Sequence, residues 1–531
     1  MFYIALVTHI ILQKKNNGVI GVSVTVNESN IFSRVVSAES LAEQSIDIEF
    51  SLPDYCPEIN KILKCFCDVA VLSKTAMENC AELGGQISVS LLYEDQDNSI
   101  ATFNYVCPFT KHVDLNGACE GDHLMVVTRS PFINTKAVAP RKVEIHGSVM
   151  MNVKAHRLVA TKVISSILED YICQKQTDIE YSKPLKIIEK NIYLEDDFSI
   201  GQNRPSISKI IRANASPTIK ELKQVGNKLI IKGDVKIEVL YLSAQHNSPI
   251  TVTESCEFSQ VAECDSALDA AKCLANVNVL TTEFRTKTSL DGEARIIAFE
   301  IKLAVGVECY ETECVSVVTD AFACKCPAEI TTEEILMEKY LEPLSENFVI
   351  KKNIDFSDGQ LSEVYDVFCD ANIDYHSVDD NTLTAKGVVT IFILGRNSEH
   401  EAVLYERNVD FEYRYEFNEI MGDIACEPNI KIVAVNFSKG MGNDVDIAVE
   451  MCICANIFSK FSTTALTDIK CDLECKTDSC DEIAAVIYFA SDETAWDIAK
   501  RYGTSAELIC NLNNLENCDT VCNKKLLIPL V

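Results

Sequence analysis

Residues 85–93 read Gly-Gln-Ile-Ser-Val-Ser-Leu-Leu-Tyr, and this stretch decides the fold because it occurs three times. It recurs at residues 233–241 as Gly-Asp-Val-Lys-Ile-Glu-Val-Leu-Tyr and at residues 387–393 as Gly-Val-Val-Thr-Ile-Phe-Ile. Side chains at every second position of a strand lie on the same face. Each copy therefore predicts a β-strand with one buried face, and so does a later alternating block at residues 143–149, 297–303 and 445–451.

A shorter block lies ahead of each of these strands. It reads Pro57-Glu-Ile59-Asn-Lys-Ile62-Leu63 in the first copy, and it recurs at residues 205–211 and 360–365. Apolar residues at i, i+3 and i+4 predict a short helix with one buried face. Asp54 and Glu58 are then expected at the start of the first helix, where carboxylates stabilise free N–H groups. The alternative is that these two carboxylates contact a partner.

The repeats predict a mainly β protein with several domains. We expect three tandem β-rich domains, each with a short helix, at residues 23–175, 176–330 and 331–472. Residues 1–22 would precede them, either as an N-terminal extension or as an artefact of a start codon assigned too early. An acidic linker at residues 473–482 would lead to a small β-α-α-β module at residues 483–531.

Composition narrows the functional classes. The chain has 79 acidic and 48 basic residues and a net charge of −31, which disfavours nucleic acid and anionic lipid as partners. The apolar run from Met1 to Leu12 is too short for a transmembrane segment. None of the eight histidines belongs to a metal-binding or catalytic motif, and no C-x-x-C pair occurs. We therefore expect no metal, no cofactor and no enzymatic activity.

The 24 cysteines allow more than one interpretation. Cys65/Cys67, Cys324/Cys326 and Cys452/Cys454 are spaced by two, which places each pair on one face of a strand as small core residues. A second group lies in or near the C-terminal module and comprises Cys471, Cys475, Cys480, Cys510, Cys518 and Cys522. Buried thiols and disulfide cross-links in an extracellular coat both remain open for this group.

The last 49 residues predict a separate module. Residues 484–489 form a strand, Ser491 to Thr494 a turn and helix cap, and residues 495–503 a helix that ends at a glycine. The expected core comprises Trp496, Ile498, Tyr502, Leu508, Leu526 and Ile528. The expected binding surface comprises the two loops that flank the helices, with Ser491, Asp492, Glu493, Thr494, Ala495, Asn514, Glu516, Asn517 and Asp519.

Two families resemble these patterns. The stretch Leu52-Pro53-Asp54-Tyr55-Cys56-Pro57-Glu58-Ile59 is similar to the motif of the SPOCS domain of spore-coat structural proteins. The second copy keeps Pro205 and Ile207 but lacks the acids, and the third copy lacks the proline. The C-terminal sequence W-D-I-A-K-R-Y-G-T-S, with E-L-I-C-N-L-N-N-L and K-L-L-I-P, resembles a LysM domain.

LysM domains bind N-acetylglucosamine chains of peptidoglycan or chitin between their two loops. Here Asp492-Glu493-Thr494-Ala495 replaces the usual Gly-Asp-Thr-Leu turn, and Cys522-Asn523 replaces the usual Pro-Gly. Loss of glycine restricts close approach of the backbone to a ligand, so the resemblance implies a retained fold with an altered sugar groove.

The combination of domains resembles clostridial coat morphogenetic proteins. It implies a non-enzymatic scaffold, made in the mother-cell cytoplasm and placed on the forespore surface, that becomes part of the spore coat. Its LysM domain would bind a coat morphogenetic ATPase, and other parts would bind other coat proteins. The acidic surface suggests basic patches on the partner. A peptidoglycan-binding cortex or cell-wall protein is the alternative, and a cell-wall hydrolase is a further one.

Overall fold

The structure is a computed structural model that is mainly β. It describes residues 22–128, 132–245, 248–263, 271–324, 326–356, 361–379, 381–417, 423–440, 444–472, 485–491, 493–515 and 524–530. The N-terminal run from Met1 to Leu12 and the predicted linker at residues 473–482 lie outside these ranges.

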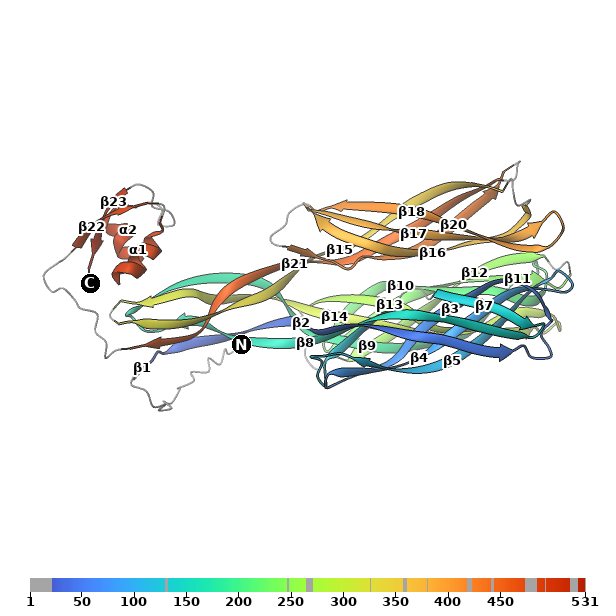
Figure 1. Ribbon diagram of the computed structural model, residues 1–531, viewed down its shortest axis with the longest axis horizontal. Helices are drawn as coiled ribbons and strands as arrows, with labels where there is room; N and C mark the ends of the chain where they lie inside the picture. Colours follow the sequence, from blue (N-terminus) through green and yellow to red (C-terminus); the bar gives the residue numbers. More distant parts are fainter. Residues whose placement is uncertain are drawn as a thin grey trace.

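The same order of strands recurs three times along the chain (Figure 1). The first set comprises β2 (Val26–Ser51), β3 (Ile59–Met77), β4 (Cys80–Asp95), β5 (Ile100–Asp114), β6 (His123–Thr128), β7 (Phe132–Ala139) and β8 (Lys142–Ile167). The second comprises β9 (Ile172–Ser199), β10 (Ile207–Val225), β11 (Lys228–Ser243), β12 (Pro249–Glu263), β13 (Lys272–Thr288) and β14 (Ala294–Ala323). The third comprises β15 (Ala328–Asp355), β16 (Leu361–Asp379), β17 (Thr382–Asn397), β18 (Ala402–Glu416), β19 (Asp423–Ala425), β20 (Asn429–Lys439) and β21 (Asp444–Cys471).

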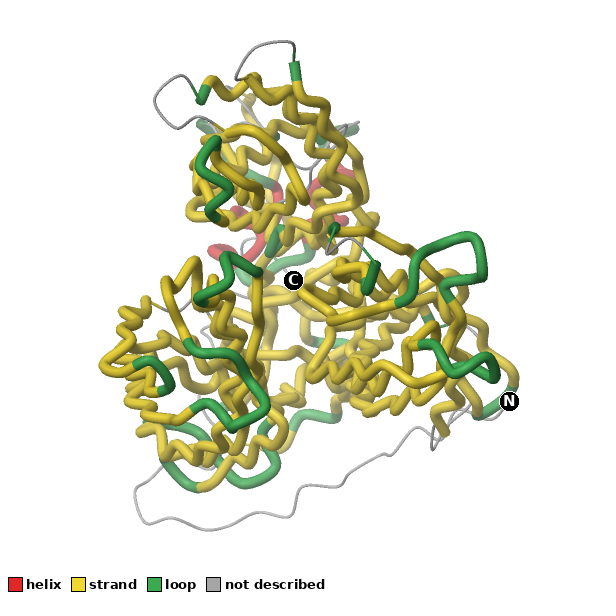
Figure 2. Tube along the Cα trace, turned by 90° about the vertical axis from the view of Figure 1, so that its right-hand side faces the viewer, coloured by secondary structure: helices red, strands yellow, loops and turns green. Residues whose placement is uncertain are grey.

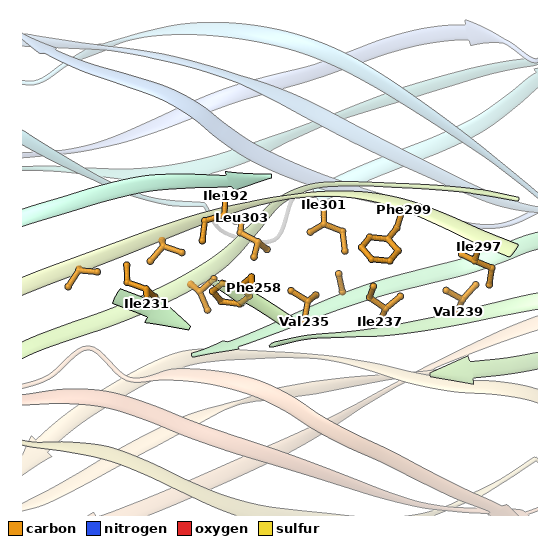
Figure 3. Packing of buried hydrophobic residues seen from close by; sticks show 14 of the residues in the cluster. Ile192, Ile231, Val235, Ile237, Val239, Phe258, Ile297, Phe299, Ile301 and Leu303 are labelled. Carbon is orange, nitrogen blue, oxygen red and sulfur yellow. The ribbon is translucent and has the colours of Figure 1, made fainter. Parts of the chain in front are cut away.

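Each set folds into a sandwich of two antiparallel sheets. In the second set, β10, β11 and β12 form one sheet, and β14 lies between β9 and β13 in the other. The alternating residues of β11 and β14 meet between the sheets, with Val235, Ile237 and Val239 against Ile297, Ile301 and Leu303 (Figure 3). The strands predicted from residues 85–93, 233–241 and 387–393 are therefore the central strands β4, β11 and β17.

A glycine and a phenylalanine lie opposite each other in every set. Gly85 pairs with Phe109, Gly233 with Phe258, and the third pair is Gly387 with Phe411. A Cβ on Gly233 would lie 2.6 Å from the Phe258 ring and would also contact the carbonyl oxygen of Thr218. Only glycine admits the ring and the neighbouring backbone together. This explains why the repeated stretch begins with that residue.

The prediction of a short helix in each repeat is wrong. Residues 59–63, 207–211 and 361–365 are the beginnings of strands β3, β10 and β16. Two register shifts occur there in each set, between Ile59 and Lys61 and between Ile62 and Lys64 in the first. A bulge inserts one residue and moves the following side chains to the other face. Two bulges in succession thus produce an apolar spacing of three, which imitates a helix.

Asp54 and Glu58 consequently do not cap a helix. Glu58 forms an ion pair with Arg141, with Oε1 3.3 Å from Nε. Arg141 also donates from its NH1 group to the carbonyl oxygens of Pro53 and Cys56, both at 3.0 Å. Arg295 donates in the same way to the carbonyl oxygens of Gly201 and Arg204, 148 residues after Pro53 and Cys56. An arginine far along the chain therefore holds each turn: Arg141 holds the turn before β3, and Arg295 holds the turn before β10.

The three strand sets surround a common axis. Seen along the long axis, they form three lobes (Figure 2). Equivalent leucines, Leu92, Leu240 and Leu394, are buried together in one cluster. The long outer strands extend beyond the sandwiches as three two-stranded ribbons, which we call the stem. Its buried side chains include equivalent residues of each set, namely Ile31, Val163, Ile179, Val317, Ile335 and Ala465.

The chain enters and leaves the three-set body at the tip of the stem. The short strand β1 (Val22–Ser23) pairs with the end of β21, where Val22 lies opposite Cys471. The connections from β8 to β9 and from β14 to β15 lie at the same tip (Figure 1). The C-terminal module lies next to this tip. The repeats are thus packed side by side and not strung end to end.

Candidate docking module

The C-terminal module has the predicted order β-α-α-β. It comprises β22 (Ala485–Ala490), α1 (Ala495–Tyr502), α2 (Ala506–Leu512) and β23 (Lys524–Pro529), and the two strands pair antiparallel. Thr494 caps α1, since its Oγ1 accepts from the Asp497 backbone N–H at 3.0 Å. Gly503 ends the helix with φ 63°, in the left-handed region that favours glycine.

The predicted core residues fall into three groups. Ile498, Leu526 and Ile528 are buried, as expected. Trp496 and Tyr502 are partly buried against the same cluster. Leu508 is 45 % exposed, so its assignment to the core is wrong. On α2 the buried residues are Ile509 and Cys510, which lie one and two positions further along and belong to the same core cluster as Leu526 and Ile528.

Polar groups of the loop between β22 and α1 form hydrogen bonds within the module. Glu493 accepts from Arg501 NH2 at 2.6 Å and from the Tyr488 hydroxyl at 2.7 Å, and these two hydrogen bonds lower the pKa of its carboxyl. The Thr494 hydroxyl lies 2.7 Å from Asp497 Oδ2, and this hydrogen bond lowers the pKa of Asp497. Ala495 is 0 % exposed. Of the predicted binding residues in this loop, Ser491 alone is exposed among those described, and Asp492 lies outside them.

The second predicted loop is only partly described. Asn514 is exposed and adopts φ 50°, a left-handed conformation that asparagine tolerates. Glu516, Asn517 and Asp519 lie outside the described residues. The neighbouring Asn513 connects α2 to β23, because its side chain donates to the Leu527 carbonyl oxygen and accepts from the Leu527 N–H, both at 2.7 Å.

The module contacts the stem through one face of α1. Trp496 Nε1 donates to Asp320 Oδ2 at 2.7 Å, and Lys500 Nζ lies 2.7 Å from Asp320 Oδ1. The Trp496 ring packs edge-on against Phe322, with ring centroids 4.9 Å apart. Phe322 is buried in the same cluster as the module's own core. Trp496 therefore serves the contact with β14 as well as the module, which the sequence prediction missed.

An apolar surface lies on the outer face of the small sheet. Ile487, Phe489 and Leu527 are 58 %, 71 % and 40 % exposed, and Ile487 lies directly opposite Leu527. We call these three residues the outer face. Lys525 lies opposite Phe489, and its ammonium is 5.8 Å from the ring centroid. Sequence reasoning also missed this surface, although the spacing of two between Ile487 and Phe489 indicates it.

The described residues offer little for catalysis. They contain no group of three or more His, Cys, Asp or Glu side chains placed to hold a metal ion. A cavity of about 520 Å³ lies between the first two strand sets and is lined by Tyr55, Cys56, Asp95, Thr102 and Lys209, among others. Burial raises the pKa of Cys56, which disfavours a reactive thiolate there. None of the described helices has the length and apolar character that crossing a membrane requires.

The cysteines are partly distributed as expected. Cys65 and Cys67 are buried in the core of the first sandwich. Cys510 is disulfide-bonded. Cys475, Cys480, Cys518 and Cys522 lie outside the described residues.

Comparison with known proteins identifies two kinds of domain. The family model described as SipL, SPOCS domain, matches residues 58–133 and 206–287, and the LysM domain model matches residues 490–529. No curated protein and no solved structure matches the chain. The two SPOCS matches span equivalent strands of the first and second sets, and the LysM match coincides with the C-terminal module. This chain is therefore a protein of SPOCS domains with a C-terminal LysM domain, both non-catalytic binding modules, and it is related to the spore coat.

Proposed function

We propose that this chain is a non-enzymatic scaffold of the spore coat that binds a coat morphogenetic ATPase through its LysM domain. It would be made in the mother-cell cytoplasm and assembled on the forespore surface, and its SPOCS domains would contact other coat proteins. The observation that carries the proposal is the outer face, since exposed adjoining apolar side chains are typical of a protein interface.

The loop that binds sugar in LysM domains supports the same conclusion. Recognition of a sugar needs polar groups that are available to the ligand. Glu493 and Thr494 already bond to Arg501, Tyr488 and Asp497, and the Ala495 side chain is inaccessible. A peptidoglycan ligand remains the second candidate, and the LysM family match favours it.

The charges near the outer face indicate which side chains a partner would present there. The whole chain is acidic, which favours basic groups on a partner, but Lys524 and Lys525 are exposed beside Phe489. A partner that contacts the outer face would therefore present apolar side chains flanked by acidic ones.

We also propose that the third strand set is a third SPOCS domain, and that the domains span residues 23–175, 176–330 and 331–472. The support is structural. The third set repeats the glycine–phenylalanine pair at Gly387 and Phe411, and it repeats both bulges at the start of β16. Leu394 also occupies the place of Leu92 and Leu240 in the shared cluster.

Capture by the full-length chain distinguishes the two candidate ligands. Purified coat morphogenetic ATPase and purified murein are each offered to the wild type, to Phe489→Ser and to Tyr193→Ser. Tyr193 is an equally exposed aromatic residue on β9 and serves as the matched control. We expect the wild type and Tyr193→Ser to capture the ATPase and Phe489→Ser to lose most of it. Capture of murein alone, or full capture of the ATPase by Phe489→Ser, would overturn the proposal.

A further inference from the structure

Two pairs of thiols join β14 to its two neighbouring strands in the second set. Cys273 on β13 lies directly opposite Cys309 on β14, and their Sγ atoms are 2.6 Å apart. Cys324 follows the end of β14 and lies next to Cys173 on β9, with the Sγ atoms 3.6 Å apart. The backbone holds the second pair in place, since the Cys324 N–H donates to the Tyr171 carbonyl oxygen at 2.9 Å.

The placement of both pairs suits a disulfide. Cys273 and Cys309 are directly opposite in an antiparallel sheet, where Cβ atoms are about 4.5–5.5 Å apart, close to the spacing that a disulfide requires. Cys173 lies opposite Phe322, two positions before Cys324, and the 3.6 Å between the Sγ atoms of Cys173 and Cys324 brings these two thiols together. A disulfide bond is about 2.05 Å long, so small side-chain rotations bring either pair to bonding distance. Cys510 is already disulfide-bonded.

We propose that Cys273–Cys309 and Cys173–Cys324 are disulfide-forming sites that connect β14 covalently to β13 and to β9, with a low-molecular-weight disulfide as the oxidant. The two sites use four cysteines that the scaffold function leaves without a role. They are intramolecular, and they differ from cross-links through the cysteines of the linker or the LysM domain.

The exchange proceeds in two balanced steps. The Cys273 thiolate attacks one sulfur of the oxidant RSSR, forms a mixed disulfide and releases RS⁻, which takes up the proton that Cys273 lost. Cys309 then attacks the Cys273 sulfur and releases a second RSH, so the two thiols lose two electrons and two protons to the oxidant. The hydrogen bond from Cys309 lowers the pKa of Cys273, and Cys273 is half-buried whereas Cys309 is buried. These properties make Cys273 the first residue to react.

The two disulfides have different consequences. Cys273 and Cys309 are 36 residues apart, whereas Cys173 and Cys324 are 151 apart and lie at the first and last strands of the set. Closing a longer loop removes more entropy from the unfolded chain, so the second disulfide stabilises more in the loop-entropy description. It also lies beside Asp320 and Phe322, which hold the LysM domain. Oxidation would therefore strengthen the part of the stem that carries the docking module.

The test uses the full-length chain, purified with reductant and then equilibrated with oxidised glutathione. Peptide mapping by mass spectrometry is expected to find the two linked peptide pairs, each lighter by two hydrogens than the reduced pair. The melting temperature is expected to rise by several degrees. Cys314 is exposed on β14 and reports access of glutathione by forming a mixed disulfide.

Single variants separate the two sites. Cys273→Ser should remove only the first linkage and Cys173→Ser only the second, whereas Cys256→Ser should remove neither. Cys256 is a half-buried thiol whose Sγ bonds to the carbonyl oxygen of Glu257, so it is a matched control. The proposal is overturned if Cys314 is modified while both pairs keep their thiols. A stable glutathione adduct on Cys273 or Cys173, or linkage of either to another cysteine, would also overturn it.

Discussion

Trp496 Nε1 donates a hydrogen bond to Asp320 Oδ2 at 2.7 Å, although the two residues are 176 positions apart. Asp320 lies near the end of β14 in the second strand set, and Trp496 lies in the first turn of α1 in the LysM domain. The same carboxylate pairs with Lys500. One acidic side chain therefore holds two groups of the LysM domain against the stem.

Replacing Asp320 by Ala should release the LysM domain from the stem without unfolding it. The indole loses its hydrogen-bond acceptor and gains access to water. Because Trp496 is the one tryptophan in the sequence, its emission reports this contact, and we expect a shift to longer wavelength. Asp178→Ala is the control, since Asp178 bonds to Ser316 on the same ribbon. An unchanged emission spectrum in Asp320→Ala would show that the contact is not formed in solution.

Replacing Gly233 by Ala should destabilise the second domain by about 2–3 kcal/mol, a typical cost of overpacking. The new methyl group would press on the Phe258 ring and on the carbonyl oxygen of Thr218, and neither can move far in a buried sheet. Chemical denaturation measures the change. Gly306→Ala is the control with a smaller loss, since its Cβ would meet the amide end of the Asn276 side chain, which can rotate away. Equal losses in both variants would contradict this explanation.

Replacing Leu240 by Ala should weaken all three strand sets together. Leu240 is buried where it meets Leu92 and Leu394, so the variant leaves a cavity shared by the three domains at a cost of about 2–5 kcal/mol. Scanning calorimetry is expected to show one transition for the three strand sets in the wild type and the same single transition, at lower temperature, in the variant. Leu290→Ala, at a fully exposed position, should leave the transition unchanged. Separate transitions for the three domains would refute the shared core.

Asp122 should make stability depend on pH in the acid range. The Arg157 hydrogen bonds lower the pKa of Asp122 to about 2, and backbone N–H and Ser37 hydrogen bonds add to this. A carboxyl whose pKa is lower in the folded state stabilises the fold above its unfolded pKa, near 3.9, and loses this contribution as the pH falls through its folded value. Asp122→Asn should therefore be less stable than the wild type at pH 7.

The difference between the two proteins should shrink as the pH falls from about 4 to about 2. Urea unfolding of both at several pH values measures it. Asp114→Asn, at an exposed carboxyl on the same strand set, is the control and should follow the wild type throughout. A difference between Asp122→Asn and the wild type that stays constant down to pH 2 would be inconsistent with the Arg157 interaction.

The alternation of apolar and polar residues was sufficient to predict a strand that buries one face in a sandwich. The alternation at residues 85–93, 233–241 and 387–393 correctly predicts the central strands. Every second side chain of a strand points to the same face, so one buried face leaves an alternating pattern in the sequence. The first LysM helix, α1, was also predictable from the sequence, since Thr494 and Gly503 mark its two ends. The first residues of β3, β10 and β16 were predicted wrongly, because paired bulges shift the alternation and give the apolar spacing of a helix.

The repeated strands, the mainly β class and the LysM module at the C-terminus were thus predictable from the residue pattern. The packing of the repeats around one axis, the contact of Trp496 with Asp320 and the exposure of Ile487, Phe489 and Leu527 became visible only in three dimensions. Periodicity shows which face of a strand avoids water, but it does not show what covers that face. A leucine such as Leu240 can pack inside its own sandwich or against a neighbouring strand set. Which of the two occurs depends on residues more than 100 positions away, here Leu92 and Leu394.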